Sequence, residues 1–405
     1  MFDAGNITRR TYQEAVQRPQ LHAPAQHEEE IIAPESVAAA FRAIDPVLQR
    51  FGLPYAPQQL RQQQPFPLQV RVSLHAQLSW RLYEALLSTL EAPDLRYAAI
   101  ILVDGIPVVL LGGKRDLYHR AFHAKRQVGS VSKLFFYESV WHMGYVHPEE
   151  VVHDGDMPEA LRHQLGRPPY HPRNDDGQLR PPLPHHHSLS HSINKIAYRT
   201  TWGERTAAQR LAITKRLAQR FAFPWQHVSR RGLSHFYHSF TSDESVALGT
   251  WHATPFEIAA MLEQGFRGHA LRRDQLILAW HDTHLKHASA TTGVGLSPHL
   301  FRALRAAVAP TAPEAIRPDT PWTLAAKTGT TDGGRDAWFV GFIVPRQEKS
   351  YATIHPRITF VTWAGYDDGR AAGLYGGSVH GPVFRRFLQD YRVQAMISAL
   401  LRQAR

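Results

Sequence analysis

The stretch WTLAAKTGTTDGGRDAWFVGFIV, residues 322–344, contains two runs that are typical of β-strands, WTLAAKTGT and DAWFVGFIV. A third such run, RITFVTWAGY, follows at 357–366. Much earlier, YAAIILVDGIPVVLLGG at 97–113 predicts a hairpin around the turn pair Asp104-Gly105. The region between, from about 130 to 310, is helix-rich and interrupted by prolines. Strands at both ends predict one sheet assembled from distant segments, which is an α+β fold rather than an alternating βαβ fold.

The remaining patterns divide the chain at about residue 67. Residues 1–67 are predicted to form an N-terminal helix followed by a linker or adaptor, within which 34–51 has helical spacing. Residues 68–405 are predicted to form the main domain. We expect this domain to begin with a strand at 68–74 and an amphipathic helix at 76–90, and to end with a helix near 382–400.

The composition is that of a folded globular protein and excludes several kinds of chemistry. The chain has 405 residues, of which 43% are hydrophobic and 20% charged. It has no cysteine, which excludes disulfides, thiol catalysis and cysteine-based zinc sites. The net charge of +11 favours anionic partners, but the basic residues are scattered, so nucleic acid is not an expected partner. The N-terminus lacks the apolar core of a signal peptide, and no stretch is apolar enough to span a membrane.

Three short motifs with a role in serine chemistry occur in order along the main domain. They are GSVSK at Gly129–Lys133, Ser-Ile-Asn at 192–194, and Lys-Thr-Gly at 327–329, extended by Thr330. The pentapeptide HSINK at 191–195 is ambiguous. Ser192 fits Ser-x-x-Lys as a nucleophile with Lys195 as its base, and it also fits Ser-x-Asn as a helper. The order of the motifs and the glycine before Ser130 favour Ser130 as the nucleophile, so we expect Lys195 to point away from it.

The residue types at these positions suit acyl transfer. If a helix begins at Ser130, then Ser130 and Lys133 lie three residues apart on one face and can touch. A serine hydroxyl is a weak nucleophile until a neighbouring base takes its proton. A lysine can act as that base when burial and a second cation lower its pKa, and Lys327 would be that cation. Free N–H groups at a helix N-terminus also suit a developing oxyanion.

The third motif suits the binding of a peptide-like substrate. Gly329 removes a side chain from a strand edge, so a substrate backbone can approach it. Thr328 and Thr330 offer hydroxyl groups to a substrate carboxylate. Each motif alone is weakly informative, because Ser-x-x-Lys occurs twice in this chain and arises by chance. The ordered set of three is the informative feature.

This set is the one found in penicillin-binding proteins and serine β-lactamases. Over residues 68–390 the chain resembles the transpeptidase domain of class A (bifunctional) penicillin-binding proteins. Two mild departures are Val128 and Leu134, where the family usually has proline. Residues 1–21 resemble the last helix of the family's glycosyltransferase domain, so we expect a shortened member that retains the transpeptidase half. The segments that carry the likeness are 122–135, 170–194, 247–259, 325–342 and 363–387, of which YHPRNDDG to SLSHSIN at 170–194 resembles the stretch leading to the family's Ser-x-Asn motif.

The resemblance implies a fold and a set of residue roles. The fold would be that of penicillin-binding proteins and serine β-lactamases, an antiparallel sheet flanked by helices plus a helical subdomain. The substrate would be the D-Ala-D-Ala end of a peptidoglycan stem peptide. The implied roles are nucleophile for Ser130, general base for Lys133, proton relay for Ser192, clamp on substrate and Lys133 for Asn194, fixed positive charge for Lys327, carboxylate binding for Thr328 and Thr330, and oxyanion hole for the N–H groups of Ser130 and Thr330.

The resemblance also implies partners and a location. The protein would be a peptidoglycan DD-transpeptidase that acts outside the cytoplasm through an acyl-serine intermediate, without a cofactor. Its partners would be stem peptides, β-lactams as covalent inhibitors, and a glycosyltransferase or other cell-wall synthesis proteins. A DD-carboxypeptidase and a non-catalytic stem-peptide-binding scaffold are alternatives. A β-lactamase is disfavoured, because Glu204, Glu244 and Glu257, which lie between the second and third motifs, are not in segments that resemble its deacylating loop.

Histidines gather immediately before the second motif. They are His185, His186, His187 and His191. His187 and His191 have the i, i+4 spacing that can hold zinc on a helix. We favour a solvated polar loop before a helix over a metal site, because the sequence places no further ligand beside this pair.

Overall fold

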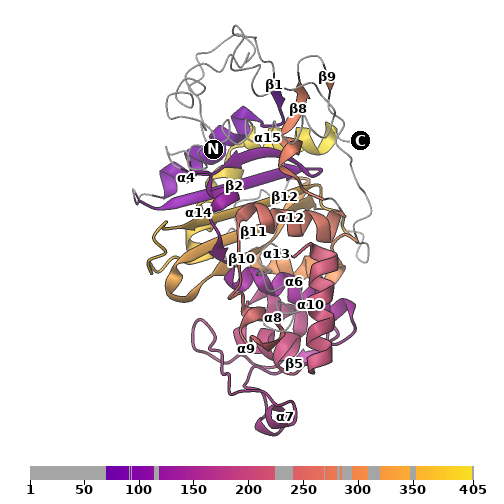
Figure 1. The fold of residues 1–405 in the computed structure, drawn as a ribbon. Coiled ribbons are helices and arrows are strands. Elements are labelled where there is room, and N and C mark those ends of the chain that lie inside the picture. The colour runs from indigo at the N-terminus through magenta and orange to yellow at the C-terminus, as the bar shows by residue number, and fades with distance from the viewer. Residues whose placement is uncertain are drawn as a thin grey trace, which may run out of the picture.

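The computed structural model describes most of residues 70–403 (Figure 1). The described ranges are 70–90, 92, 94–113, 118–223, 240–268, 270–280, 283–284, 294–308, 320–346 and 353–403. The N-terminal helix, the linker and the domain boundary predicted at 1–67 lie outside these residues. The described part therefore belongs to the predicted main domain.

A five-stranded antiparallel sheet, in the order β10-β11-β12-β2-β3, forms the centre of the described part. The predicted hairpin at 97–113 is present and joins the sheet through β12, which comes from the C-terminal part of the chain. The sheet is thus assembled from distant segments, as the strand pattern predicted. β10 is an edge strand and pairs with β11 from Trp322↔Pro345 to Thr330↔Ala337. The strands are β2 (Arg96–Val103), β3 (Ile106–Leu111), β10 (Trp322–Thr330), β11 (Asp336–Pro345) and β12 (Ile358–Gly365).

Helices cover both faces of this sheet, so its strands are buried on both sides (Figure 1). Helices α4 (Ala76–Thr89), α14 (Gly376–Gln389) and α15 (Tyr391–Gln403) form one layer. Helix α12 (Pro255–Leu262) contacts β2 and β12 on the other face. The strand β2 shows the division, since alternate side chains enter two separate apolar cores. One core receives Ala98, Ile100 and Leu102, and the other receives Tyr97, Ala99 and Ile101.

A mostly helical part lies beyond the edge strand β10 (Figure 1). Its central helix, α6 (Ser132–His142), buries five apolar side chains, from Leu134 to Tyr137 and at Val140, as well as Ser132, Lys133 and Ser139, which suits a helix enclosed by others. The other helices of this part are α7 (Glu159–Gln164), α8 (His185–Ser190), α9 (Asn194–Tyr198) and α10 (Ala207–Phe221). Helix α13 (Pro298–Val308) packs against both β10 and α8 and so connects the two parts.

Short elements complete the described chain. The short helices are α5 (Arg120–His123), η1 (Gly129–Val131), η2 (Arg199–Gly203), η4 (Val246–Leu248), η5 (Glu263–Arg267), η6 (Arg273–Leu276) and η7 (Asp332–Gly334). Two small strand pairs are β4 (Arg126–Gln127) with β7 (His252–Ala253) and β5 (Val151–Val152) with β6 (Leu183–Pro184). A separate three-stranded sheet contains β1 (Val70–Val72), β8 (Ile277–Trp280) and β9 (Thr283–His284).

Two sequence predictions need correction at the ends of the domain. The first strand forms, but it pairs with β8 in the small sheet and not with the main sheet. The single C-terminal helix expected near 382–400 is two helices, α14 and α15, and Pro382 lies inside the first. The break falls at Asp390, whose backbone is extended and whose carboxylate accepts a hydrogen bond from the N–H of Arg392 (2.8 Å). This carboxylate caps the second helix, which explains why the chain restarts there.

A buried ion pair connects the helices of the helical part. Arg210 on α10 donates two hydrogen bonds, each 2.7 Å long, to the carboxylate of Glu244. The hydroxyl of Tyr198 on α9 donates a third, at 2.8 Å. Arg210 is fully buried and Glu244 is 8% exposed. Removal of one member would leave the other charge unpaired in the interior, which is far more costly than loss of a surface pair.

We predict that Glu244→Gln lowers the free energy of unfolding by about 3 kcal/mol, because it leaves the guanidinium of Arg210 buried without a countercharge. Urea denaturation followed by circular dichroism measures this change. The matched control is Glu84→Gln, which breaks the more exposed pair of Glu84 with Arg81 (2.9 Å) and should cost less than about 1 kcal/mol. Equal effects of the two substitutions would contradict the structural role given to Glu244.

Candidate active site

The predicted nucleophile, Ser130, lies in η1, directly before helix α6. The turn is tightly enclosed. Gly129 has φ +53°, and a Cβ there would overlap the carbonyl oxygen of Thr330 on β10. On the other side, the N–H of Gly129 donates to the carbonyl of Gly249 (3.0 Å). A side chain at position 129 would therefore push the nucleophile turn away from the edge of the sheet, and glycine is required there for both conformation and space.

Gly329 has a different role from the one expected. A Cβ at this position would lie 2.8 Å from the carbonyl oxygen of Val128 and 2.8 Å from Cγ2 of Val131. The glycine therefore allows β10 to approach the nucleophile turn of the same chain. The expectation that it opens the strand edge for a substrate backbone needs this correction, because the space that it leaves is filled by the segment around Ser130.

Lys133, one turn into the nucleophile segment, is completely buried and faces the second motif. Among the described residues its Nζ donates to the carbonyl of Ser192 (2.5 Å), the hydroxyl of Ser192 (3.2 Å) and Oδ1 of Asn194 (2.5 Å). The hydroxyl of Ser130 is not one of these acceptors. The structure thus joins the first and second motifs through Lys133, although the direct contact between Ser130 and Lys133 that the spacing allowed is not formed.

Lys327 brings the third motif to the same point. Its Nζ donates to the hydroxyl of Ser192 (2.8 Å) and to the carbonyl of Thr328 (3.0 Å), and its side chain is 1% exposed. Ser192 therefore lies between two lysines. Its backbone has φ +57°, a conformation that non-glycine residues rarely adopt. Such strain is typical of functional positions whose surroundings fix the backbone.

Lys195, the alternative base in HSINK, points elsewhere. Its Nζ forms an ion pair with Oδ1 of Asp156 at 2.6 Å, and its side chain is 18% exposed. The expectation that Lys195 points away from Ser130 is confirmed. Among the described residues, Lys195 therefore donates no hydrogen bond to Ser192. The geometry fits Ser192 as the serine of the Ser-x-Asn motif and not as the serine of a Ser-x-x-Lys pair.

Two residues that sequence reasoning did not select organise the second motif. The side chain of Asn174 accepts from the N–H of Asn194 (3.1 Å) and donates to Asp154 (2.8 Å). The carboxylate of Asp175 accepts from Nδ2 of Asn194 (3.0 Å). The available signal was the segment YHPRNDDG at 170–177, which resembles the stretch leading to the family's second motif. Asn174 and Asp175 thus hold Asn194 with its Oδ1 toward Lys133.

The two buried lysines have lowered pKa values. Burial lowers the pKa of Lys133 well below its usual value, and the neighbouring charge of Lys327 lowers it further. Burial lowers the pKa of Lys327 to about 8. The carboxylate of Asp175 opposes both shifts, since its negative charge favours the protonated ammonium groups. The site therefore combines Lys133, which loses its proton readily, with Lys327, which stays largely charged at neutral pH.

Thr328 and Thr330 share one face of β10, and both are partly exposed. The hydroxyl of Thr330 accepts a hydrogen bond from the N–H of Gly376, the first residue of α14 (3.1 Å). Lys327 and Gly329 occupy the opposite positions of the strand alternation and are buried. Thr328 and Thr330 therefore lie on the partly exposed face of the edge strand.

The histidines before the second motif do not form the expected solvated loop. They form helix α8, and His185 and His186 are buried. His185 accepts from Nε1 of Trp141 (2.7 Å) and hydrogen-bonds Thr200 (2.7 Å), and burial lowers its pKa to about 3. His187 and His191 are exposed. The proline-rich approach obscured a helix that only tertiary packing stabilises.

Each acid weighed as a deacylating group has a structural partner. Glu204 pairs with Arg199 (2.8 Å), and Glu244 pairs with Arg210. Glu257 is the third residue of α12 and completes a capping box with Thr254. Each of these three carboxylates thus has a structural role, in an ion pair or in a helix cap.

The comparisons with known proteins agree with this geometry. No family model matches the chain. Penicillin-binding protein 1B of Vibrio cholerae is 25% identical over 330 residues, which cover 73% of this chain and 36% of that protein. The solved penicillin-binding protein PonA1 of Mycobacterium tuberculosis aligns with TM-score 0.68 and 15% identity over 90% of this chain and 92% of that chain. PonA1 in complex with penicillin V aligns with TM-score 0.65 and 17% identity, over 89% and 93%.

The chain therefore spans about a third of the length of the curated relative. Among the described residues, no helix is both long and apolar enough to cross a membrane. The sequence relatives and the shared architecture identify the chain as a homologue of the class A penicillin-binding proteins, with the fold of their transpeptidase domain.

Proposed function

We propose that the protein is a peptidoglycan DD-transpeptidase that acts through an acyl-Ser130 intermediate. The observation that carries the proposal is the convergence of Lys133 and Lys327 on Ser192, directly beside the turn that presents Ser130. Two buried lysines with lowered pKa values on one hydroxyl have no evident structural purpose, and perturbed groups of this kind gather at catalytic sites.

In the proposed acylation, Ser130 Oγ attacks the carbonyl carbon of the penultimate D-alanine, and its proton passes to neutral Lys133. The C–N bond to the last D-alanine breaks. Ser192 gives its proton to the leaving nitrogen and takes back the proton held by Lys133, which returns Lys133 to the neutral state. The substrate-free structure lacks a Ser130–Lys133 hydrogen bond, which is common for catalytic contacts that tighten only with substrate. An amine of a second stem peptide then attacks acyl-Ser130, forms the cross-link and returns the hydroxyl.

The other groups would bind the substrate. Thr328, Thr330 and the charge of Lys327 would hold the terminal carboxylate, Asn194 would hold the amide, and the N–H groups of Ser130 and Thr330 would stabilise the oxyanion. A β-lactam would imitate the D-Ala-D-Ala end and remain on Ser130, as the penicillin V complex of PonA1 suggests. The substrate places the activity outside the cytoplasm, with cell-wall synthesis proteins as partners.

Labelling with a fluorescent penicillin tests the assignment of nucleophile and base. Ser130→Ala and Lys133→Ala should abolish the covalent label, because they remove the attacking hydroxyl and its base. Lys195→Ala should leave it nearly intact, since Lys195 pairs with Asp156. An undiminished penicillin label on the Ser130→Ala variant would contradict the proposal. A stem-peptide donor with and without an amine acceptor then separates transpeptidase from carboxypeptidase, which transfers the acyl group to water.

Acylation should follow a bell-shaped pH profile. Neutral Lys133 is needed as base, so the rate should rise with pH as that lysine loses its proton. The positive charge of Lys327 is needed at the carboxylate, so the rate should fall above about pH 8, the pKa of that lysine. Lys327→Arg stays charged and should lose the alkaline limb but keep the acid limb. The rate of penicillin acylation measured across pH checks this, and an alkaline limb unchanged in Lys327→Arg would contradict it.

Asp175→Asn should shift both limbs of this profile to lower pH. The substitution removes the negative charge that raises the pKa of both lysines, while the amide oxygen can still accept from Asn194. The matched control is Asp176→Asn, because the neighbouring Asp176 pairs with Arg180 at the surface. The control should leave the profile unchanged. Equal shifts in the two variants, or none in Asp175→Asn, would contradict this role.

A further inference from the structure

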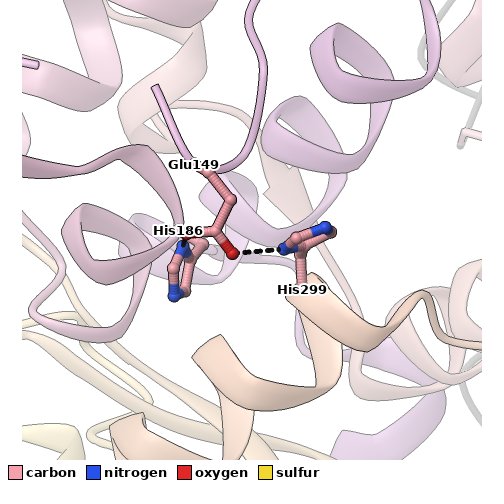
Figure 2. A group of neighbouring side chains, drawn as sticks. All are labelled: Glu149, His186 and His299. Carbon is pink, nitrogen blue, oxygen red and sulfur yellow. Dashed lines mark ion pairs between the residues drawn. The ribbon is translucent and has the colours of Figure 1, made fainter. Parts of the chain in front are cut away.

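A second cluster of chemically active side chains lies on the helical part, outside the candidate active site (Figure 2). Glu149 comes from the segment after α6, His186 from α8 and His299 from α13. Nδ1 of His299 lies 2.9 Å from Oε1 of Glu149, and Nδ1 of His186 lies 3.6 Å from Oε2. One ligand atom from each residue lies within 4.8 Å of the other two.

These side chains are held by fixed backbone. The N–H of His185 donates to the carbonyl of Glu150 (2.8 Å), and the N–H of His186 donates to that of Pro148 (2.9 Å). These bonds hold the segment of Glu149 against the start of α8. Helix α13, which carries His299, packs directly on α8. The cluster is thus a junction of three segments and not a chance meeting of mobile surface groups.

The contact between His299 and Glu149 is incomplete as it stands. Nδ1 of His299 is shielded from solvent and has no hydrogen-bond partner among the described residues, because its approach to Glu149 lacks hydrogen-bond geometry. A proton on Nδ1 of His299 would be attracted to the Glu149 carboxylate. With the proton on Nε2 instead, the Nδ1 lone pair faces that carboxylate, and a metal ion between the two atoms satisfies both.

We propose that Glu149, His186 and His299 bind a divalent transition-metal ion of the kind that prefers imidazole, with Zn²⁺ as the expected occupant. Ligand atoms about 2.0–2.1 Å from a tetrahedral zinc ion lie roughly 3.3 Å from one another. The two observed separations, 2.9 Å to Oε1 and 3.6 Å to Oε2, end on different oxygens of the Glu149 carboxylate. One ligand atom from each residue lies within 4.8 Å of the other two, so small side-chain rotations bring all three to that spacing. Glu149 is exposed and His299 partly exposed, which leaves the fourth position open to water.

The hydrogen bonds of His186 suit this role, because a metal ligand must be a neutral imidazole with a free lone pair. Nδ1 of His186 also lies 3.1 Å from the carbonyl of Pro148, but that carbonyl already accepts the N–H of His186. The tautomer protonated at Nε2 therefore frees Nδ1 for the metal without leaving the carbonyl unpaired.

One neighbouring cation competes with the metal. Nη1 of Arg302 lies 3.3 Å from Oε1 of Glu149, and the Arg302 side chain is 47% exposed. The guanidinium can leave toward solvent when a metal binds, at some cost in affinity. Removal of this charge should therefore tighten binding, a result that a purely structural role of the cluster does not predict.

The position suggests what the metal would do. The segment of Glu149 follows the helix of Lys133, His186 precedes Ser192 by six positions, and the helix of His299 packs on the strand of Lys327. A metal ion would join the three segments that carry the three motifs. Binding would therefore stabilise the arrangement around Ser192, since a ligand that binds only the folded state raises its stability.

Cobalt and zinc titrations test the site without any assay of activity. Chelator-treated protein is titrated with Co²⁺, whose visible absorption reports tetrahedral coordination, and the ion is then displaced with Zn²⁺. Wild type should show one saturable site. Glu149→Gln and His299→Ala should weaken it by at least the roughly 10- to 100-fold that follows loss of a hydrogen-bond partner of a metal ligand. Arg302→Gln should bind more tightly.

The control is His163→Ala, which removes an exposed histidine that also pairs with a glutamate, Glu159 (3.4 Å), on α7. It should bind like wild type and should gain the same increase in melting temperature with zinc. Melting curves in chelator show whether each variant folds. Three outcomes would each overturn the proposal: absence of a saturable site, equal affinity in Glu149→Gln and wild type, or an unchanged affinity in Arg302→Gln. His299 would then carry a proton on Nδ1 toward Glu149 without a metal.

Discussion

The candidate site depends on two lysine side chains buried around one serine. Lys133 and Lys327 approach the hydroxyl of Ser192 to 3.2 and 2.8 Å, and neither lysine is appreciably exposed. Burial of an ion is costly unless hydrogen bonds and a countercharge compensate it. Here the compensation comes from backbone carbonyls, the amide of Asn194 and the charge of Asp175.

This constraint explains why the protein needs two structural parts. The sheet supplies Lys327 on an edge strand, and the helical part supplies Lys133 and Ser192. The nucleophile turn lies between them and can do so only because Gly129 and Gly329 lack side chains. The close packing of the strand against the nucleophile turn also keeps water from the two lysines. Because burial lowers the pKa of a lysine, this packing is also the cause of their lowered pKa values.

The sequence was informative where a pattern is local. The hairpin, the strands of 322–344 and the three motifs followed from side-chain alternation, turn residues and short spacing, and the structure places Ser192 and both lysines together. Asn174 and Asp175 were missed because their roles depend on hydrogen bonds to a residue about twenty positions away. The same reason hid the group of Glu149, His186 and His299, whose members are separated by up to 150 positions.

Other errors arose where tertiary contacts outweigh local preference. Helix α8 was read as a solvated polar loop because the sequence placed no partner beside its histidines, yet His185 is buried and hydrogen-bonds Trp141 and Thr200. Gly329 was assigned to the substrate, although the group that fills its space is the chain's own nucleophile turn. In each case the pattern marked an unusual position, and its neighbours could be known only from the fold.

The most direct measurement is the site of covalent modification by a β-lactam. Wild-type protein would be incubated with benzylpenicillin, digested and mapped by tandem mass spectrometry. The account predicts one adduct with the mass of intact penicillin, on Ser130 in the segment 126–133. An adduct on Ser192, or none under conditions where the protein is folded, would contradict the account.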